Sequence, residues 1–240
     1  MPRPLALLFD LDGVLVRSEE CWFRTVEAAG LRFRGSPVTR EEFSPTFGQG
    51  TAADIREFSL CCSVAQLDAF YVETFPRFAE HVWTNPEAAR LLERLAALGL
   101  RRAVVTNTVS PLAAIILQAA GLDRAFDLIA CADQVKEAKP APDLVLYALE
   151  RLGLRAEDAW MVGDSRYDRE AARQAGVRFV GLGIEGDCRI DRLGELASLL
   201  DGQGDQRRGE PWPGKARSAS GDPAPGAPAP DEPSARSGRA

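Results

Sequence analysis

Two carboxylates follow a short apolar stretch near the beginning of the chain. Residues 7–9 are all apolar, as in buried strands of parallel sheets, and Asp10, Leu11, Asp12 and Gly13 come directly after them. Alternate residues of an extended chain point to the same side, so Asp10 and Asp12 should project together. Two neighbouring carboxylates are costly unless a cation lies between them. The pattern therefore predicts a metal ion and chemistry at this strand end, and it lacks the spacing of an EF-hand calcium loop.

Other residues that could take part in chemistry follow apolar stretches later in the chain. Thr106 and Asn107 follow one such stretch, Asp164 follows another with Asp168 four residues on, and Lys139 lies in a loop before a predicted helix. Taken singly, these residues are typical of a turn, a helix cap or a surface charge. In open α/β sheets, however, the functional crevice lies at the carboxyl ends of the strands. Polar groups that recur at these ends therefore predict one shared site.

Helical and strand-like segments alternate after residue 84. Proline next to Asn, Ser or Asp begins three of the predicted helices, and glycine follows most of the helix ends. Strands that alternate with helices imply a parallel sheet with helices on both faces, which predicts an α/β fold with a three-layer α/β/α core. The predicted helices are 85–98, 110–120, 142–152 and 168–175, and the predicted strands after the first are 103–105, 128–130, 160–162 and 179–182.

Residues 17–84 have a different pattern and contain no convincing strand run. Thr39 with Glu42, and Ser63 with Gln66, have the spacing of capping boxes that begin helices. A long helical stretch is predicted over residues 65–79. We therefore expect a helical cap domain at 17–84, inserted directly after the Asp10 strand, over a core domain made of residues 1–16 and 85–200.

Residues 201–240 differ in composition from the rest of the chain. They hold seven of the 16 prolines, with many Gly, Ala and Ser and almost no large apolar residue. Such a segment cannot bury enough apolar surface to offset its ordering entropy. It is predicted to be a disordered tail.

Charge and composition exclude several classes of protein. The net charge of −6 predicts no general affinity for nucleic acid or for an anionic membrane surface. The five cysteines include no Cys-x-x-Cys pair, and no apolar stretch is long enough for a signal peptide or a membrane span. We therefore expect a cytoplasmic protein with reduced thiols. The chain contains no signal for its oligomeric state.

The four groups of polar residues together resemble the motifs of the haloacid dehalogenase superfamily. The resemblance spans residues 5 to about 184 and is strongest to the phosphoglycolate phosphatase-like branch, which has a helical cap inserted between the first two motifs. The motifs stand at residues 10–14 (Asp-Leu-Asp-Gly-Val), 105–107 (Val-Thr-Asn), 139–143 (Lys-Pro-Ala-Pro-Asp) and 163–168 (Gly-Asp-Ser-Arg-Tyr-Asp). The resemblance implies a Mg²⁺-dependent phosphatase that acts on a small phosphorylated metabolite.

The resemblance also implies catalytic roles that physical chemistry supports. Asp10 would be the nucleophile that forms an aspartyl-phosphate, and Asp12 would act as general acid and then as general base. Thr106 and the backbone of Asn107 would donate hydrogen bonds to the phosphate oxygens. Lys139 would bind the phosphate as well, neutralise its developing charge and help to hold Asp10.

A metal site and its supporting residues follow from the same resemblance. Mg²⁺ would be held by Asp10, by the backbone carbonyl of Asp12 and by Asp164, a sparse ligand set that this ion accepts. Asp168 and Ser165 would support these groups from a second layer, with Asp168 orienting Lys139 or a metal-bound water.

A glycine-containing segment of the predicted cap resembles the substrate loop of the family. It comprises Gly48, Gln49 and Gly50, although two glycines in this spacing are also typical of a simple turn. Phosphomutases of the superfamily usually carry an arginine near this loop, where the chain has Thr51, so a mutase is less favoured. Dehalogenases lack the second carboxylate, so Asp12 argues against that reaction.

Two departures from the family pattern concern the substrate. Many phosphoglycolate phosphatases have Thr where the chain has Val14, and several have Lys where it has Thr108. Neither change affects the proposed chemical groups, but both weaken the assignment to phosphoglycolate in particular. The prediction is therefore a phosphatase for a small phosphomonoester, with phosphoglycolate as one candidate. The alternatives are a pyrophosphatase, a sugar-phosphate phosphatase or phosphomutase, and a non-catalytic regulator that retains the fold.

Overall fold

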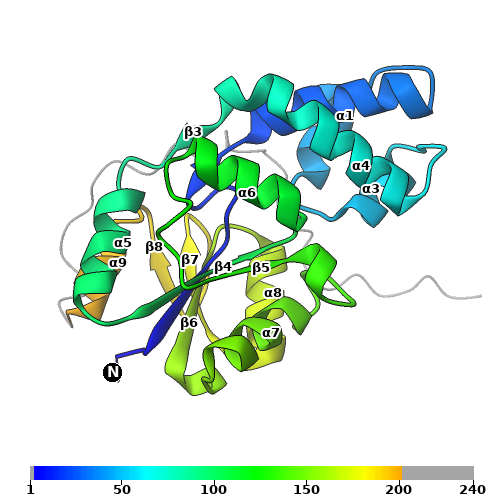
Figure 1. Ribbon diagram of the computed structural model, residues 1–240. Coiled ribbons are helices and arrows are strands. Elements are labelled where there is room, and N and C mark those ends of the chain that lie inside the picture. The colour runs from blue at the N-terminus through cyan, green and yellow to red at the C-terminus, as the bar shows by residue number, and fades with distance from the viewer. Residues whose placement is uncertain (1–2, 202–240) are drawn as a thin grey trace, which may run out of the picture.

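A parallel sheet of six strands forms the centre of the computed structural model, which describes residues 3–201 (Figure 1). The strand order is β5-β4-β1-β6-β7-β8, so β1 lies in the interior of the sheet between β4 and β6. The strands are β1 (Ala6–Phe9), β4 (Arg101–Thr106), β5 (Leu128–Cys131), β6 (Ala159–Gly163), β7 (Arg178–Leu182) and β8 (Cys188–Ile190).

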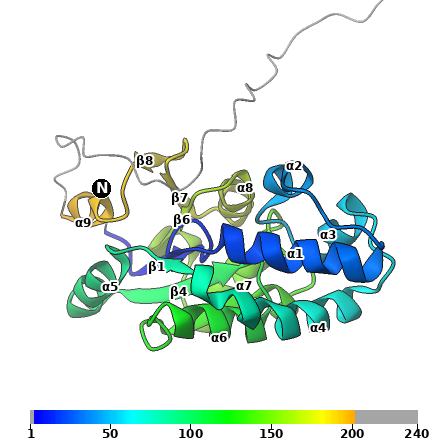
Figure 2. The ribbon, with the colours of Figure 1, turned by 90° about the horizontal axis from the view of Figure 1, so that it is seen from above.

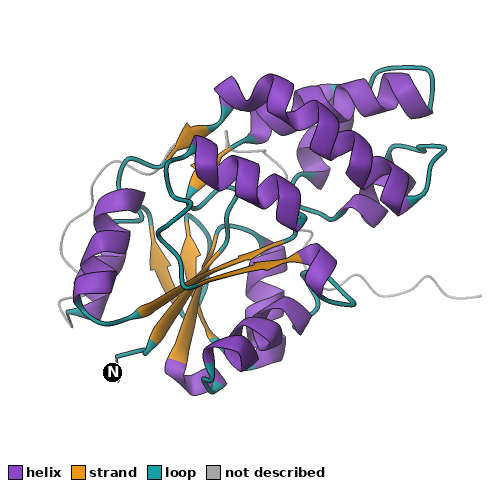
Figure 3. Cartoon of the chain, viewed as in Figure 1, coloured by secondary structure: helices purple, strands orange, loops and turns teal. Residues whose placement is uncertain are grey.

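Helices cover both faces of this sheet, as the view by secondary structure shows (Figure 3). Side chains of β1 alternate between two apolar clusters, with Leu7 and Phe9 in one and Ala6 and Leu8 in the other. The first cluster includes residues of α5, α6 and α9, and the second includes residues of α7 and α8. These helices are α5 (Ala88–Ala97), α6 (Ser110–Ala119), α7 (Asp143–Leu152), α8 (Arg166–Ala175) and α9 (Glu195–Leu200), with 3₁₀ helices η3 (Ala132–Gln134) and η4 (Ala156–Asp158). The predicted three-layer α/β fold with a parallel sheet is confirmed.

The segment between β1 and α5 is mainly helical, and its helices lie together beside the sheet (Figure 2). It contains α1 (Glu19–Phe33), α2 (Arg40–Phe43), η1 (Ser44–Thr46), α3 (Thr51–Glu57), α4 (Val64–Thr74) and η2 (Phe75–His81). Thr39 and Ser63 both form the predicted capping boxes, with Glu42 and Gln66 respectively. The capping patterns in the sequence therefore correctly located the starts of α2 and α4.

A short antiparallel ribbon lies where this segment begins and ends. It pairs β2 (Val16–Arg17) with β3 (Trp83–Thr84), and the Arg17 guanidinium lies 4.7 Å from the centre of the Trp83 ring. The division into a core of 1–16 and 85–200 and a cap of 17–84 stays a prediction. The ribbon lies at both of its proposed boundaries.

Two of the predicted helices differ clearly from the structure. The helix predicted over residues 65–79 ends at Thr74 and continues as the 3₁₀ helix η2, because Pro76 has no amide hydrogen to continue α-helical bonding. The helix predicted from residue 85 begins at Ala88. The Asn85 side chain instead accepts a hydrogen bond from the Glu87 amide at 3.0 Å and donates to the Val14 carbonyl at 3.0 Å.

Several elements were not predicted at all. Strands β2 and β3 have two residues each, which is too short to produce an apolar alternation. Strand β8 has three residues, and the polar Arg189 interrupts it. Helix α9 was also missed, although the predicted core extends to residue 200.

The described residues bear on two further predictions. None of the helices within residues 3–201 is both long and apolar enough to cross a membrane. All five cysteines lie in this part of the chain, and all are free thiols. Residues 202–240, which make up nearly all of the predicted tail, lie outside the described residues.

Candidate active site

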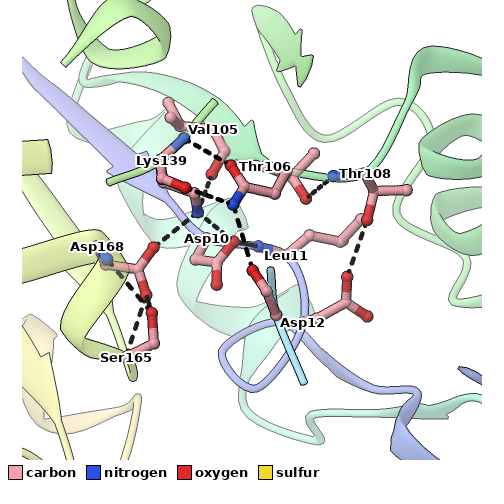
Figure 4. A network of polar contacts seen from close by, with 11 residues as sticks. Asp10, Leu11, Asp12, Val105, Thr106, Thr108, Lys139, Ser165 and Asp168 are labelled. Carbon is pink, nitrogen blue, oxygen red and sulfur yellow. Dashed lines mark hydrogen bonds and ion pairs between the residues drawn. The ribbon is translucent and has the colours of Figure 1, made fainter. Parts of the chain in front are cut away.

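The carboxyl ends of three adjacent strands bring the predicted site residues together (Figure 4). Asp10 follows β1, Thr106 ends β4, and Asp164 follows β6. Because β1 pairs in register with both neighbours, these three ends lie side by side at one edge of the sheet. A single pocket contacts Asp10, Thr106 and Asp164. The crevice predicted from the strand ends is therefore present.

Lys139 is buried at the centre of this site. Its ammonium group donates to Asp10 Oδ1 at 2.8 Å, to Asp168 Oδ1 at 2.6 Å and to the Val105 carbonyl at 2.8 Å. The three donors of the ammonium are thus all engaged, and the side chain is only 3% exposed. Asp10 Oδ1 also accepts from the Leu11 amide at 2.8 Å, which fixes the orientation of its carboxylate.

The charges of these groups shift one another's protonation equilibria. Burial and the Asp168 carboxylate raise the pKa of Asp10, Asp164 raises it further, and Lys139 opposes them. The pKa of Asp10 is raised overall. Burial alone would lower the pKa of Lys139, but Asp10 and Asp168 outweigh burial and raise that pKa, so the lysine stays charged. This end of the pocket has more negative than positive charge and suits a further cation.

The Asn107 side chain holds the backbone of Lys139 in place. Its Oδ1 accepts from the Lys139 amide at 2.8 Å, and its Nδ2 donates to the Lys139 carbonyl at 2.9 Å. The same Nδ2 donates to the Gly48 carbonyl at 3.2 Å. Asn107 therefore links the lysine loop of the core to the predicted substrate loop.

Asp12 lies at the same pocket and is held by two hydroxyl groups. Ser18 donates to its Oδ1, and Thr108 donates to its Oδ2 at 3.2 Å. Burial raises the pKa of Asp12, while the bonds from Ser18 and Thr108 reduce that rise. The Thr108 amide donates to Thr106 Oγ1 at 3.1 Å, so the hydroxyl of Thr106 keeps its own hydrogen for another acceptor.

Asp168 is fixed at the start of α8 by Ser165. The Ser165 hydroxyl and amide both donate to Asp168 Oδ2, at 2.5 and 3.1 Å, and the Asp168 amide donates back to the hydroxyl at 3.2 Å. A side-chain carbon at Gly163 would lie 2.4 Å from Asp168 Cβ, so only glycine fits there. Asp168 is completely buried and supports Lys139 from below the pocket.

The carboxylates of Asp10, Asp164 and Asp168 could hold a metal ion. One oxygen from each lies within 4.8 Å of the others. Both oxygens of Asp168 already accept hydrogen bonds, Oδ1 from Lys139 and Oδ2 from Ser165, whereas the bonds to Asp10 reach only its Oδ1, so Asp10 is the better ligand of the two. Oxygen-rich sites of this kind suit Mg²⁺, which needs few carboxylates because it keeps several waters.

Gly13 makes room for the Asp164 carboxylate at this position. Gly13 has φ +93°, and a side-chain carbon built on it would lie 2.2 Å from Asp164 Oδ2. Only glycine can therefore occupy this position while Asp164 stays where it is. The residues present fit the implied metal, and the full ligand set of Asp10, Asp12 and Asp164 stays a prediction.

The pocket continues from these core residues into the helical segment. Gly48 and Gln49 of the predicted substrate loop line it, whereas Gly50 does not and instead precedes α3. Aromatic side chains give the pocket an apolar wall on this side. They are Trp22, Phe43, Phe47 and Tyr71.

Several residues that line or support the pocket were not identified from the sequence. Ser18 had no signal beyond its place before a helix, and its contact with Asp12 depends on the turn at residues 11–16. Asp54 and Tyr71 come from two different helices, and each is typical of an ordinary amphipathic helix by itself. Their approach depends on the packing of α3 against α4, which no local pattern reveals.

Comparisons with known proteins give the same family as the motifs. A family model described as haloacid dehalogenase-like hydrolase matches residues 7–182. A phosphoglycolate phosphatase of Photorhabdus laumondii is 35% identical over 187 residues, which cover 74% of this chain and 79% of that protein. A protein of Caldanaerobacter subterraneus, provisionally named pyrophosphatase PpaX, is 32% identical over 177 residues, covering 74% of this chain and 80% of that protein.

A solved structure has the same fold. CbbY from Rhodobacter sphaeroides in complex with phosphate has a TM-score of 0.74 and 27% identity, covering 82% of this chain and 99% of that one. A variant of CbbY in complex with xylulose-1,5-bisphosphate has a TM-score of 0.72 and 27% identity, covering 80% of this chain and 96% of that one. From the match of the family model over most of the chain, and from these relatives, the chain belongs to the haloacid dehalogenase-like hydrolases and resembles their phosphoglycolate phosphatase-like members.

Proposed function

We propose that this hydrolase is a Mg²⁺-dependent phosphatase that cleaves small phosphomonoesters through a phosphorylated Asp10. The observation that carries the proposal is the arrangement around Lys139. This ammonium binds Asp10 at 2.8 Å at the floor of a pocket that also contains Asp12 and Thr106. A carboxylate, a buried cation and a second carboxylate at one strand end are the groups that phosphoryl transfer by a carboxylate requires.

In the first step, a carboxylate oxygen of Asp10 attacks phosphorus, and the bond from phosphorus to the leaving oxygen breaks. Asp12 in its protonated form gives its proton to the leaving oxygen, so the alcohol departs neutral. The hydrogen bonds from Ser18 and Thr108 hold the Asp12 carboxyl group at the pocket during this transfer. General acid catalysis of this kind contributes about 10²–10⁴-fold to the rate.

In the second step, Asp12 has become a carboxylate and accepts a proton from a water molecule. The oxygen of that water attacks phosphorus, the bond from phosphorus to Asp10 breaks, and inorganic phosphate leaves. Asp12 is then protonated again and Asp10 is an ionised carboxylate, so both residues return to their starting states.

Thr106 and Asn107 would bind the phosphate in both steps, and the buried charge of Lys139 would offset its negative charge. The Thr106 hydroxyl and the backbone amide of Asn107 can donate to phosphate oxygens, and the Lys139 ammonium reduces the negative charge around Asp10. Mg²⁺ held by Asp10, Asp164 and the Asp12 carbonyl would supply the remaining positive charge that a phosphate dianion needs near two carboxylates.

The relatives support a phosphorylated metabolite as the substrate. Proteins named phosphoglycolate phosphatase and a protein provisionally named pyrophosphatase are similar to this chain in sequence, and a neighbour complexed with a sugar bisphosphate is similar in structure. Phosphoglycolate, pyrophosphate and sugar phosphates are therefore the first compounds to test. The predicted cytoplasmic location and the absence of nucleic-acid and membrane partners stay predictions.

The test is phosphate release from these compounds and from p-nitrophenyl phosphate, with and without Mg²⁺. We expect metal-dependent release by the wild type and none above background by Asp10→Asn, which lacks the nucleophile. Asp123→Asn makes the same chemical change at an exposed residue and should retain wild-type rates. Acid quenching with ³²P-labelled substrate should leave label on the wild-type protein and none on Asp10→Asn.

The second arm of the test concerns Asp12. Asp12→Ala should lower turnover by at least about 10²-fold because it removes the general acid and base. Wild-type turnover in Asp12→Ala would contradict that role. Substantial hydrolysis by a folded Asp10→Asn would contradict the nucleophile.

A further inference from the structure

The far end of the pocket contains polar side chains that the proposed reaction does not use. Asp54 on α3 and Gln49 before it line the pocket together with Tyr71 on α4. They belong to the helical segment, whereas the groups that act on phosphorus belong to the core. A substrate with its phosphate at Asp10 would extend its leaving alcohol toward this end.

Asp54 is held in place at the pocket wall. The Tyr71 hydroxyl donates to its Oδ2 at 3.0 Å, and Tyr71 is itself only 2% exposed. The Trp22 ring packs edge-on against Tyr71, with their centres 5.5 Å apart. Burial raises the pKa of Asp54 to about 7, while the bond from Tyr71 and the nearby Gln49 amide limit that rise.

Gln49 places the hydrogen-bond donor of its side-chain amide beside Asp54. Its side-chain amide lies close enough to Asp54 to lower the pKa of that carboxyl group, yet its buried Nε2 makes no hydrogen bond of full geometry among residues 3–201. A buried donor in a weak hydrogen bond can gain a better acceptor when a ligand binds beside it. The carboxylate of Asp54 and the amide of Gln49 thus offer an acceptor and a donor close together.

The charges of the pocket determine which groups fit beside them. Among the described residues that line it, Lys139 is the only basic one, and its ammonium is already bound by Asp10, Asp168 and the Val105 carbonyl. The acidic residues of the lining are Asp10, Asp12, Asp54 and Asp164. A substrate carboxylate at the far end would therefore approach Asp54 with no cation of the pocket to pair with it.

We propose that Asp54 and Gln49 together bind a hydroxyl group of the leaving alcohol, so that the enzyme prefers polyol or sugar phosphates to esters such as phosphoglycolate that carry a carboxylate there. A hydroxyl can donate to Asp54 and accept from Gln49 at the same time, which satisfies both side chains. A carboxylate can accept from Gln49 but is repelled by Asp54 when that group is ionised, above its pKa of about 7, and sites discriminate through such repulsion. This inference rests on the proposed phosphatase function.

The test compares phosphomonoesters that differ only in a carboxylate or a hydroxymethyl group at the same position. The pairs are phosphoglycolate with 2-hydroxyethyl phosphate, 3-phosphoglycerate with glycerol 1-phosphate, and 5-phosphoribonate with ribitol 5-phosphate. The assays are run at about pH 8.5, where Asp54 is ionised. In the pair that the wild type cleaves fastest, we expect kcat/KM to favour the hydroxymethyl compound about 10- to 100-fold, the effect of one charged hydrogen bond.

Variants assign this preference to Asp54 and Gln49. Asp54→Asn removes the charge and should bring the ratio of kcat/KM within a pair close to one, mainly by improving the carboxylate compound. Gln49→Met removes the donor and should lower kcat/KM for the hydroxymethyl compound; it keeps the test decisive if Asp54→Asn does not fold. Glu57→Gln changes an exposed carboxylate on the same helix and should keep the wild-type ratio.

The outcomes separate this inference from the phosphatase proposal. No Mg²⁺-dependent release from any ester, including p-nitrophenyl phosphate, would overturn the proposed function itself. Release with a wild-type preference for the carboxylate compounds would overturn only the inference. A hydroxymethyl preference that persists unchanged in folded Asp54→Asn and Gln49→Met would also overturn it.

Discussion

Replacing Lys139 by Met should destabilise the fold because it leaves buried carboxylates without their cation. The Lys139 side chain is 3% exposed, and its partners Asp10 and Asp168 are 11% and 0% exposed. Removing one partner of a buried ion pair typically costs about 3–5 kcal/mol. Met has a similar volume, so little of this loss would come from a cavity. We therefore expect Lys139→Met to lower the free energy of unfolding by about 3–5 kcal/mol at pH 8 without metal.

The loss should depend on pH in a defined direction. The pKa of Asp10 is raised even with Lys139 present, and removing the ammonium raises it further. The folded variant would then bind a proton that the unfolded chain releases, so its stability falls as pH rises. As pH falls below the new pKa of Asp10, protonation of its carboxylate in the folded variant restores the free energy of unfolding by up to about 1.4 kcal/mol per pH unit. The deficit of Lys139→Met against wild type should thus be smaller at pH 5 than at pH 8.

Urea unfolding monitored by circular dichroism measures both effects. Lys136→Met is the matched control, because Lys136 is exposed in the same loop and should change stability by less than about 0.5 kcal/mol. A double-mutant cycle with Asp168→Asn should give a favourable coupling energy of about 0.5–3 kcal/mol between the two side chains. A loss below about 1 kcal/mol for Lys139→Met, equal at both pH values, would refute the reasoning.

Two further predictions concern Gly13 and Asp54. Gly13→Ala should lower stability by about 1–2 kcal/mol through its positive φ and weaken Mg²⁺ binding by at least about tenfold, because the new methyl displaces Asp164. Isothermal titration with Mg²⁺ checks this, and Gly99→Ala, which has positive φ but open space around it, should lose stability while keeping its affinity. For Asp54, whose pKa rises from 3.8 to about 7 on folding, the protonated form is favoured in the folded protein, so the free energy of unfolding should fall as pH rises from 4 to 8. In Asp54→Asn, the free energy of unfolding measured with urea should fall about 2–4 kcal/mol less over this pH range than in the wild type. Identical pH profiles for variant and wild type would contradict the burial of this carboxyl group.

Prediction from the sequence succeeded where one local pattern determines one local structure. The apolar stretch before Asp10 predicted β1, and Pro142 with Gly153 predicted the start and the end of α7. The meeting of Asp10 and Lys139, 129 positions apart, was expected because parallel strands place their carboxyl ends at one edge. The motif resemblance added roles that this geometry allows but does not by itself assign.

Prediction failed where structure depends on contacts between distant segments. β2 and β3 have two residues each and exist because the two ends of the helical segment meet. Nothing near Asp54 in the sequence indicates that Tyr71 would donate to it, since that contact requires α3 to pack on α4. For Asn107, the resemblance implied a role only for the backbone amide, as a donor to phosphate. In the structure its side chain also binds the backbone of Lys139 at two points.

That role of Asn107 connects the two ends of the pocket. One amide group fixes the loop that carries Lys139 and also donates to the Gly48 carbonyl, next to Gln49. The position of the proposed hydroxyl-binding residues is therefore set relative to the group that neutralises the phosphate. Asn107→Ala removes these hydrogen bonds. It should therefore lower both the rate of phosphoryl transfer and the preference for one leaving alcohol over another. Substitutions at Asp54 should alter only the selection, because Asp54 has no bond to the core residues that act on phosphorus.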